Sequence, residues 1–181
     1  MKQKSLQKNG NWKKRLRPIR LVLLDVDGVL TDGRLFYDGT GREYKAFHIR
    51  DGQGIVLLQR AGIRVGFLSG RVSSAVRIRA KELGICLVRQ KVVDKGKALK
   101  AICEKERMAE EEICYMGDDL IDLPAFRRVG FAVAVGDAVE EVKNCAHYVT
   151  RKRGGQGAVR ELCELILKAQ GKWQERIQPY L

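Results

Sequence analysis

Short apolar runs alternate with amphipathic segments along most of the chain. The apolar runs predict buried strands, and they occupy residues 21–26, 63–68, 86–88, 113–116 and 131–135. The amphipathic segments predict helices, and they occupy residues 55–61, 72–83, 97–108, 120–129 and 159–170. Strands that alternate with helices in this way are typical of an α/β fold. We therefore expect a mainly parallel sheet with helices on both faces.

A turn-rich segment interrupts this alternation directly after the first predicted strand. Two β-prone runs, residues 34–37 and 43–47, flank the link Asp38-Gly39-Thr40-Gly41. This pattern predicts a β-hairpin inserted over about residues 33–48. Ligands bind to open parallel sheets outside the carboxyl ends of the strands. The hairpin is therefore expected on the side of the sheet where a ligand would bind.

The chain is basic, and most of its excess charge lies near the N-terminus. Its 181 residues predict one domain and carry a net charge of +13. The first twenty residues hold eight Lys or Arg and no acid, which leaves +5 on the remaining 161 residues. Residues 1–17 also lack hydrophobic periodicity, so we expect a poorly ordered basic arm followed by a single domain over residues 18–181. Nucleic-acid binding through this arm is the alternative in which the protein is not an enzyme.

Neither the apolar stretches nor the cysteines indicate an exported or membrane protein. The longest apolar stretch near the N-terminus is Leu21–Leu24, far shorter than the roughly 20 residues of a membrane span. Five cysteines are spread along the chain without a C-x-x-C pair, as expected for buried thiols rather than zinc ligands. The sequence therefore predicts a cytoplasmic protein that has no membrane partner.

Acidic clusters follow two of the predicted strands. The first strand runs into Asp25 and Asp27, which share a face because alternate residues of an extended chain point the same way. The fourth strand runs into Asp118, Asp119 and Asp122. Carboxylates at neighbouring strand ends repel one another unless a cation lies between them, and hard oxygen ligands favour Mg²⁺. We therefore expect a magnesium site at this edge of the sheet.

Two further segments carry groups that bind phosphate. Ser69-Gly70-Arg71 ends the second strand, and Asp94-Lys95 precedes a helix. A hydroxyl, exposed backbone N–H groups and an ammonium ion are all suited to contact phosphoryl oxygens. Together with Mg²⁺, these groups predict a pocket for a phosphate ester.

The order of these motifs resembles that of the haloacid dehalogenase superfamily of phosphatases. The matching motifs are DVDGVLT at 25–31, SGR at 69–71, a lysine at 95 and GDDLID at 117–122. Longer stretches resemble one family within it, the phosphatases that release 3-deoxy-D-manno-octulosonate (KDO) from its 8-phosphate for lipopolysaccharide biosynthesis. These stretches lie at residues 25–33, 49–55, 117–124 and 148–167. The resemblance implies a Rossmann-like core and a Mg²⁺-dependent phosphoric monoester hydrolase that forms an aspartyl-phosphate.

The resemblance also implies roles for the acidic residues. Asp25 would be the nucleophile and a metal ligand. Asp27 would be the general acid and then the general base, and its backbone carbonyl would bind the metal. Asp118 would be the third protein ligand of the ion. Asp119 and Asp122 would orient ligands or water without binding the ion themselves.

A larger set of residues would bind the substrate on the same grounds. Ser69 and Lys95 would hold the phosphoryl group, and Lys95 would also neutralise charge on Asp25. KDO carries a carboxylate, which suits the planar fork of an arginine side chain. The residues that the resemblance implies to contact substrate are Asp27, Arg50, Asp51, Gly52, Ser69, Gly70, Arg71, Arg79 and Lys95.

The spacing of the motifs limits the architecture. Only 43 residues separate Asp25 from Ser69, and 23 separate Arg71 from Lys95, which leaves no room for a large cap domain. Phosphoryl transfer benefits from the exclusion of water, so an uncapped site needs cover from elsewhere. The family resemblance implies a homotetramer in which a neighbouring subunit closes each site. It also implies that residues 154–157 form a mobile lid.

Three other functions predict different features. A receiver domain of two-component signalling uses similar groups, but its acidic pair precedes the phosphorylated aspartate, whereas here the pair comes last. Nucleic-acid binding through the arm predicts salt-dependent binding that disappears when residues 1–17 are deleted. Among sugar-acid phosphatases, a nine-carbon 2-keto-3-deoxy sugar 9-phosphate is the alternative substrate, although Arg71 and Lys95 favour the eight-carbon one.

Overall fold

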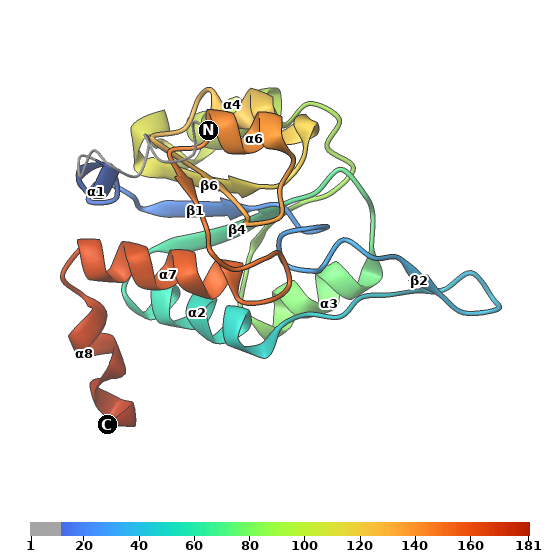
Figure 1. Ribbon diagram of the computed structural model, residues 1–181, viewed down its shortest axis with the longest axis horizontal. Coiled ribbons are helices and arrows are strands. Elements are labelled where there is room, and N and C mark those ends of the chain that lie inside the picture. Colours follow the sequence, from blue (N-terminus) through green and yellow to red (C-terminus); the bar gives the residue numbers. More distant parts are fainter. Residues whose placement is uncertain (1–11) are drawn as a thin grey trace.

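The computed structural model describes residues 12–181, which build one six-stranded sheet and a separate two-stranded hairpin (Figure 1). All neighbouring strands of the large sheet run parallel, in the order β5-β4-β1-β6-β7-β8. The strands are β1 Leu21–Leu24, β4 Arg64–Leu68, β5 Leu87–Arg89, β6 Ile113–Gly117, β7 Phe131–Ala134 and β8 Tyr148–Val149. The chain builds outward from β1 on one side and then crosses to the other side at β6. The crevice beside β1 at this reversal is where such sheets bind ligands.

Helices cover both faces of the sheet (Figure 1), which confirms the expected α/β architecture. Helices α2 Ile49–Arg60, α3 Ser74–Glu82 and α7 Ala158–Ala169 lie on one face. Helices α4 Lys95–Glu106, α5 Leu123–Phe126 and α6 Glu140–Cys145 lie on the other. The remaining elements are helices α1 Trp12–Arg15 and α8 Trp173–Ile177 and the 3₁₀ turns η1 Glu110–Glu112, η2 Leu120–Asp122 and η3 Gln178–Tyr180. Strand β1 is covered on both faces, so its four residues are fully buried and uniformly apolar.

The predicted boundaries fail where elements are short or mixed. The helix expected at 120–129 is instead the turn η2 followed by the one-turn helix α5, which has a proline in its first turn. Helix α2 begins at Ile49, before the predicted start at residue 55. The prediction missed its first turns because Gly52 and Gly54 interrupt the amphipathic pattern there. Strand β8 has only two residues, too few to stand out as an apolar run.

The expected hairpin insertion is present between β1 and α2. Strands β2 Phe36–Tyr37 and β3 Glu43–Tyr44 pair antiparallel. At the turn, the Asp38 carboxylate accepts hydrogen bonds from the backbone N–H groups of Thr40 at 2.9 Å and Arg42 at 3.0 Å. The hairpin projects beyond the carboxyl ends of the large sheet (Figure 1), and it is the only insertion between β1 and α2, so the expected absence of a large cap domain is confirmed.

The first described residues already belong to the globular fold. The Trp12 ring packs against the Tyr148 ring with their centroids 5.3 Å apart, and the Leu16 side chain is fully buried. These two apolar residues are one helical turn apart and so face the sheet together. The structure therefore places the start of the domain before residue 18, earlier than expected. The rest of the expected basic arm, residues 1–11, lies outside the described residues.

Two further expectations concern membranes and thiols. Among the helices in residues 12–181, none is both long and apolar enough to cross a bilayer. All five cysteines are free thiols. Cys103, Cys114 and Cys163 are buried, and Cys86 and Cys145 are exposed, so most of them pack as small apolar residues.

Candidate active site

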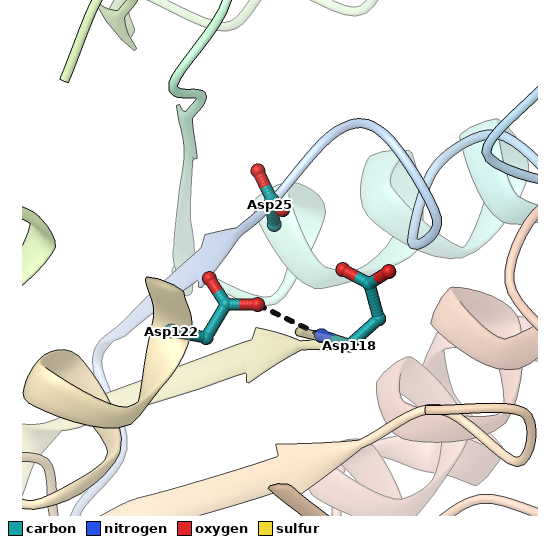
Figure 2. A group of neighbouring side chains, drawn as sticks. All are labelled: Asp25, Asp118 and Asp122. Carbon is teal, nitrogen blue, oxygen red and sulfur yellow. Dashed lines mark hydrogen bonds between the residues drawn. The ribbon is translucent and has the colours of Figure 1, made fainter. Parts of the chain in front are cut away.

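Asp25 and Asp118 meet at the carboxyl ends of the adjacent strands β1 and β6 (Figure 2). The strands are in register at Leu24 and Met116, and the Asp25 N–H donates a hydrogen bond to the Met116 carbonyl at 3.0 Å. Gly28 then turns the chain with a positive φ of 85°. A Cβ at Gly28 would lie 2.0 Å from Oδ2 of Asp118, so only glycine lets the two acidic loops come this close.

A buried lysine contacts the carboxylates of Asp25 and Asp122. Lys95 is the first residue of α4, and its side chain is fully buried. Its Nζ lies 3.0 Å from Oδ1 of Asp25 and 2.5 Å from Oδ1 of Asp122. Burial alone would lower the pKa of Lys95, but the charges of Asp25 and Asp122 outweigh that effect and raise it. Lys95 is therefore a permanent cation at the floor of the site.

Both carboxylate oxygens of Asp122 accept hydrogen bonds from other parts of the site. Besides Lys95, Oδ1 accepts a hydrogen bond from the Tyr115 hydroxyl at 2.6 Å. Oδ2 accepts hydrogen bonds from the backbone N–H groups of Asp118 at 2.8 Å and Asp119 at 3.2 Å. Asp122 thus fixes the position of Lys95 and of the Asp118 backbone. This geometry suits the orienting role that the sequence implied for it.

Asp25 and Asp118 resist losing their protons. Burial raises the pKa of Asp25 to about 7, with the charge of Asp122 adding to the effect and Lys95 opposing it. Burial, together with the charges of Asp25 and Asp122, raises the pKa of Asp118 to about 8. Each carboxylate is costly to ionise in this setting because it is desolvated and near other negative charge. A cation placed between them would reverse that balance.

The oxygen atoms of this cluster fit a divalent cation. One oxygen each from Asp25, Asp118 and Asp122 lies within 4.8 Å of the others (Figure 2). Oδ1 of Asp118 is buried and accepts no hydrogen bond from any residue in the range 12–181. Because the oxygens of Asp122 are already bonded, Asp25 and Asp118 are the carboxylates suited to a hard ion such as Mg²⁺. The carboxylate of Asp27 contacts Lys45 and Arg71.

A pocket of about 240 Å³ opens at this cluster. It is lined by Asp25, Asp27, Gly33, Ser69, Gly70, Arg71, Asp118, Asp119 and Ile121. Ser69 directly follows β4, and its hydroxyl accepts a hydrogen bond from the Arg71 N–H at 3.2 Å. The Arg71 guanidinium donates to the Tyr37 hydroxyl at 3.0 Å and to Glu43 at 2.9 Å, so the hairpin fixes it beside the pocket. Asp119 caps η2, its carboxylate accepting from the Leu120 N–H at 2.7 Å.

Five residues expected to contact substrate lie outside the lining of this pocket, namely Arg50, Asp51, Gly52, Arg79 and Lys95. The Asp51 carboxylate is buried and accepts hydrogen bonds from the backbone N–H groups of Arg160 at 2.7 Å and Gly157 at 3.3 Å. It therefore stabilises the N-terminus of α7, and the expectation that it contacts substrate is not supported within one chain. A Cβ at Gly52 would lie 2.2 Å from the guanidinium of Arg79, so Gly52 makes room for that side chain.

Residues 154–157 are a tightly packed support, not the lid expected from the sequence. The Gly154 N–H donates to the Asp137 carboxylate at 2.9 Å, and the Gly155 N–H donates to the Val29 carbonyl at 2.9 Å. A Cβ at Gly154 would lie 1.7 Å from the Gly28 carbonyl oxygen. The glycines are thus needed for close contact with the loop that carries Asp25, because no side chain fits between the two backbones.

Sequence reasoning missed two residues that contact the site. Lys45 is buried in the hairpin against Asp27 and Glu43. Tyr115, inside β6, donates to Asp122. The sequence does carry a signal for Lys45. Glu43, Lys45 and Phe47 lie on one face of an extended segment, so two charged side chains share a face with an apolar one. For Tyr115 no such signal exists, since it reads as an ordinary core residue.

Comparison with known proteins gives consistent matches in sequence and fold. A family model described as haloacid dehalogenase-like hydrolase matches residues 65–162. The 3-deoxy-D-manno-octulosonate 8-phosphate phosphatase of Haemophilus influenzae is 46% identical over 158 residues, which cover 87% of this chain and 88% of that protein.

Solved structures of proteins with the same description are similar as well. The one from Moraxella catarrhalis, in complex with a magnesium ion, a phosphate ion and KDO, gives a TM-score of 0.93 at 41% identity and covers 95% of this chain and 99% of its own. The one from Yersinia pestis gives a TM-score of 0.89 at 43% identity and covers 91% of this chain and 89% of its own. The similarity therefore extends over most of the described fold.

Proposed function

The chain belongs to the 3-deoxy-D-manno-octulosonate 8-phosphate phosphatases, a family of haloacid dehalogenase-like hydrolases, and on that premise we propose that it hydrolyses KDO 8-phosphate to KDO and inorganic phosphate. It is a Mg²⁺-dependent phosphoric monoester hydrolase, and the family resemblance assigns its product to lipopolysaccharide biosynthesis. The observation that carries this conclusion is the pocket lined by Asp25, Asp118, Ser69 and Arg71, with Lys95 buried against Asp25.

We assign the nucleophile to Asp25 and the proton transfers to Asp27. A carboxylate oxygen of Asp25 forms a bond to phosphorus while the ester bond to the sugar oxygen breaks, and Asp27 gives that oxygen a proton. Asp27 then accepts a proton from water, whose oxygen attacks phosphorus and releases Asp25 and inorganic phosphate. Mg²⁺ held by Asp25, Asp118 and the Asp27 carbonyl would neutralise charge on the phosphoryl group. Lys95 keeps Asp25 oriented through its 3.0 Å contact.

The remaining pocket residues suit the two ends of the substrate. The Ser69 hydroxyl and the backbone of Gly70 line the pocket beside Asp25 and would hold phosphoryl oxygens. Arg71, held by Tyr37 and Glu43, presents a planar fork that suits the carboxylate of a sugar acid. A nine-carbon sugar-acid phosphate carries the same two groups, and the assay below separates it from KDO 8-phosphate.

Phosphate release from KDO 8-phosphate and from a panel of other sugar phosphates tests the proposal. We expect a strong preference for KDO 8-phosphate that requires Mg²⁺ and disappears with EDTA. A preference for a nine-carbon 9-phosphate would transfer the proposal to that substrate. Absence of release from every substrate in the presence of Mg²⁺ would contradict it.

The raised pKa values give a second prediction, that Mg²⁺ stabilises the protein more at pH 8 than at pH 5.5. Without Mg²⁺, the free energy of unfolding should fall as pH rises from about 4 to 8, because the folded state holds protons on Asp25 and Asp118 that the unfolded state releases earlier. Mg²⁺ binds the ionised carboxylates, so it competes with protons at low pH. At about 100 times Kd, a ligand adds about 2.7 kcal/mol, or a rise in Tm of roughly 5–10 °C.

Thermal melting with and without Mg²⁺ at both pH values measures this difference. Asp118→Asn is the reference variant, because it removes a ligand while leaving the fold's apolar core intact. We expect it to lose most of the Mg²⁺-dependent rise at pH 8. An equal rise at both pH values in the unmodified protein would contradict the assignment of Asp25 and Asp118 as ligands.

We also propose that the protein is a homotetramer in which a neighbouring subunit completes each site. The hairpin exposes about half of the side chains of Leu35, Phe36, Tyr37 and Tyr44, and apolar surface of this kind marks an interface. Arg50 and Arg79, which the sequence assigned to the substrate, lie outside the pocket of their own chain and would act from the subunit interface. The five free thiols are consistent with a cytoplasmic location.

Light scattering after size exclusion tests the assembly. We expect the mass of four 20.4 kDa chains, and the double change Leu35→Glu, Phe36→Glu should give a smaller species with lower activity, because buried charges oppose association. Lys100→Glu, on the exposed face of α4, is the control for the added charge. A monomer with full activity would contradict the proposal.

A further inference from the structure

The hairpin carries a buried cation that the catalytic assignment does not use. The side chain of Lys45 is only 1% exposed, although lysine is rarely buried without a partner. Its ammonium group contacts a carboxylate oxygen of Asp27 and lies 3.1 Å from the carboxylate of Glu43. Lys45 therefore links the hairpin to the loop that follows β1.

Lys45 is part of a closed set of two cations and two anions. On the other side of Asp27, Nε of Arg71 lies 3.8 Å from Oδ2. The same arginine donates to Glu43 at 2.9 Å. The carboxyl group of Asp27 is thus held between Lys45 and Arg71, and Glu43 connects the two cations to each other. The charges of the four groups balance, which offsets the cost of burying the Lys45 ammonium group.

The two cations differ in their access to the substrate. Arg71 and Asp27 line the pocket, whereas Lys45 and Glu43 do not. Lys45 can therefore reach the reacting atoms only through Asp27. A proton donor must lie within hydrogen-bond reach of the leaving oxygen, and the side chain of Asp27, just before the turn at Gly28, needs an external contact to fix its rotamer.

We propose that Lys45 is a positioning residue that orients the carboxyl group of Asp27 for proton transfer to the leaving sugar oxygen, and that Glu43 holds Lys45 in place. This inference rests on the proposed function, because it takes Asp27 as the general acid. It assigns the hairpin a part in the chemistry of its own chain, in addition to the subunit contacts proposed above.

The dependence on the leaving group tests the inference. A sugar alkoxide is a poor leaving group that needs a proton, whereas p-nitrophenolate leaves without one. For Lys45→Met we expect kcat/KM to fall about 10²-fold with KDO 8-phosphate, the lower end of what general acid catalysis contributes. With p-nitrophenyl phosphate, kcat/KM should change by less than about 3-fold, no more than is typical of a neutral surface substitution. The quantity kcat/KM is used because it covers the steps up to departure of the leaving group.

Three further variants make the result specific. Asp27→Asn should show the same selectivity for the leaving group, and Glu43→Gln a weaker form of it, because Glu43→Gln loosens Lys45 without removing it. Arg42→Met, an exposed change in the same hairpin, should leave both rates unchanged. The Mg²⁺-dependent rise in Tm of each variant reports whether the site still forms, and Glu43→Gln carries the test if Lys45→Met does not fold.

The outcomes separate the inference from the function. Equal losses with both substrates, or a loss that appears only in KM, would assign Lys45 to phosphate binding or to stability and would overturn the inference. Unchanged rates in Lys45→Met would also overturn it, while activity of the unmodified protein on KDO 8-phosphate keeps the proposed function. If the unmodified protein does not act on KDO 8-phosphate, the proposed function fails and the inference falls with it.

Discussion

Asp25→Asn is expected to lower kcat/KM for KDO 8-phosphate by at least about 10⁴-fold, a loss of about 5 kcal/mol in transition-state stabilisation. The amide cannot form the bond to phosphorus, and it also removes a charged ligand of the ion. The fold should persist, because Lys95 keeps its contact with Asp122 at 2.5 Å. Phosphate release under Mg²⁺ saturation measures the loss, and a melting curve checks the fold.

Asp32→Asn is the matched control for this change. Asp32 lies in the same loop, but its carboxylate accepts a hydrogen bond from the Arg34 N–H at 3.1 Å and does not line the pocket. Its substitution should change the rate by less than about 3-fold. Retention of more than about 1% of the activity in Asp25→Asn would remove Asp25 from the role of nucleophile.

Lys95→Met is expected to damage both activity and stability. Removing the cation leaves Asp25 and Asp122 buried without their partner, and breaking a buried ion pair in this way costs about 3–5 kcal/mol. Activity should fall by at least about 10²–10³-fold, because Asp25 loses the cation that orients its carboxylate. Chemical denaturation at pH 8 gives the stability change, and phosphate release gives the catalytic one.

The pH dependence of the Lys95→Met stability loss identifies its cause. The difference from the unmodified protein should be largest at high pH and should shrink as pH falls toward about 7, because Lys95 lowers the pKa of Asp25 and the variant therefore protonates Asp25 at a higher pH. Lys97→Met, an exposed residue of the same helix, should be nearly neutral throughout. A loss that is independent of pH would indicate a packing defect instead of an unpaired charge.

The elements that could be predicted from the sequence are those whose own residues determine them. Strand β1 is apolar at every position because both of its faces are covered, so its pattern alone predicted it. Strand β8, in contrast, exists because Val133 and Ala134 offer an open edge to Tyr148 and Val149. That information lies in another part of the chain and leaves no periodic signal.

The same distinction separates the predicted and the missed parts of the site. Asp25 and Asp118 were found because two adjacent strand ends must bring them together. Lys45 was missed because its partner Asp27 is brought near it only by the path of the hairpin. Asp51 was assigned to the substrate by resemblance, but its partners are backbone N–H groups at the start of α7, which no side-chain motif encodes.

The contact between residues 154–155 and the Asp25 loop has a consequence for the synthesis of the protein. The loop is among the first parts of the domain to leave the ribosome, but its support at Gly154 and Gly155 is among the last. At translation rates of about 5–20 residues per second, the nucleophile waits on the order of ten seconds for that support. A nascent chain therefore carries Asp25 without a working site, and catalysis begins only when the C-terminal quarter has been made.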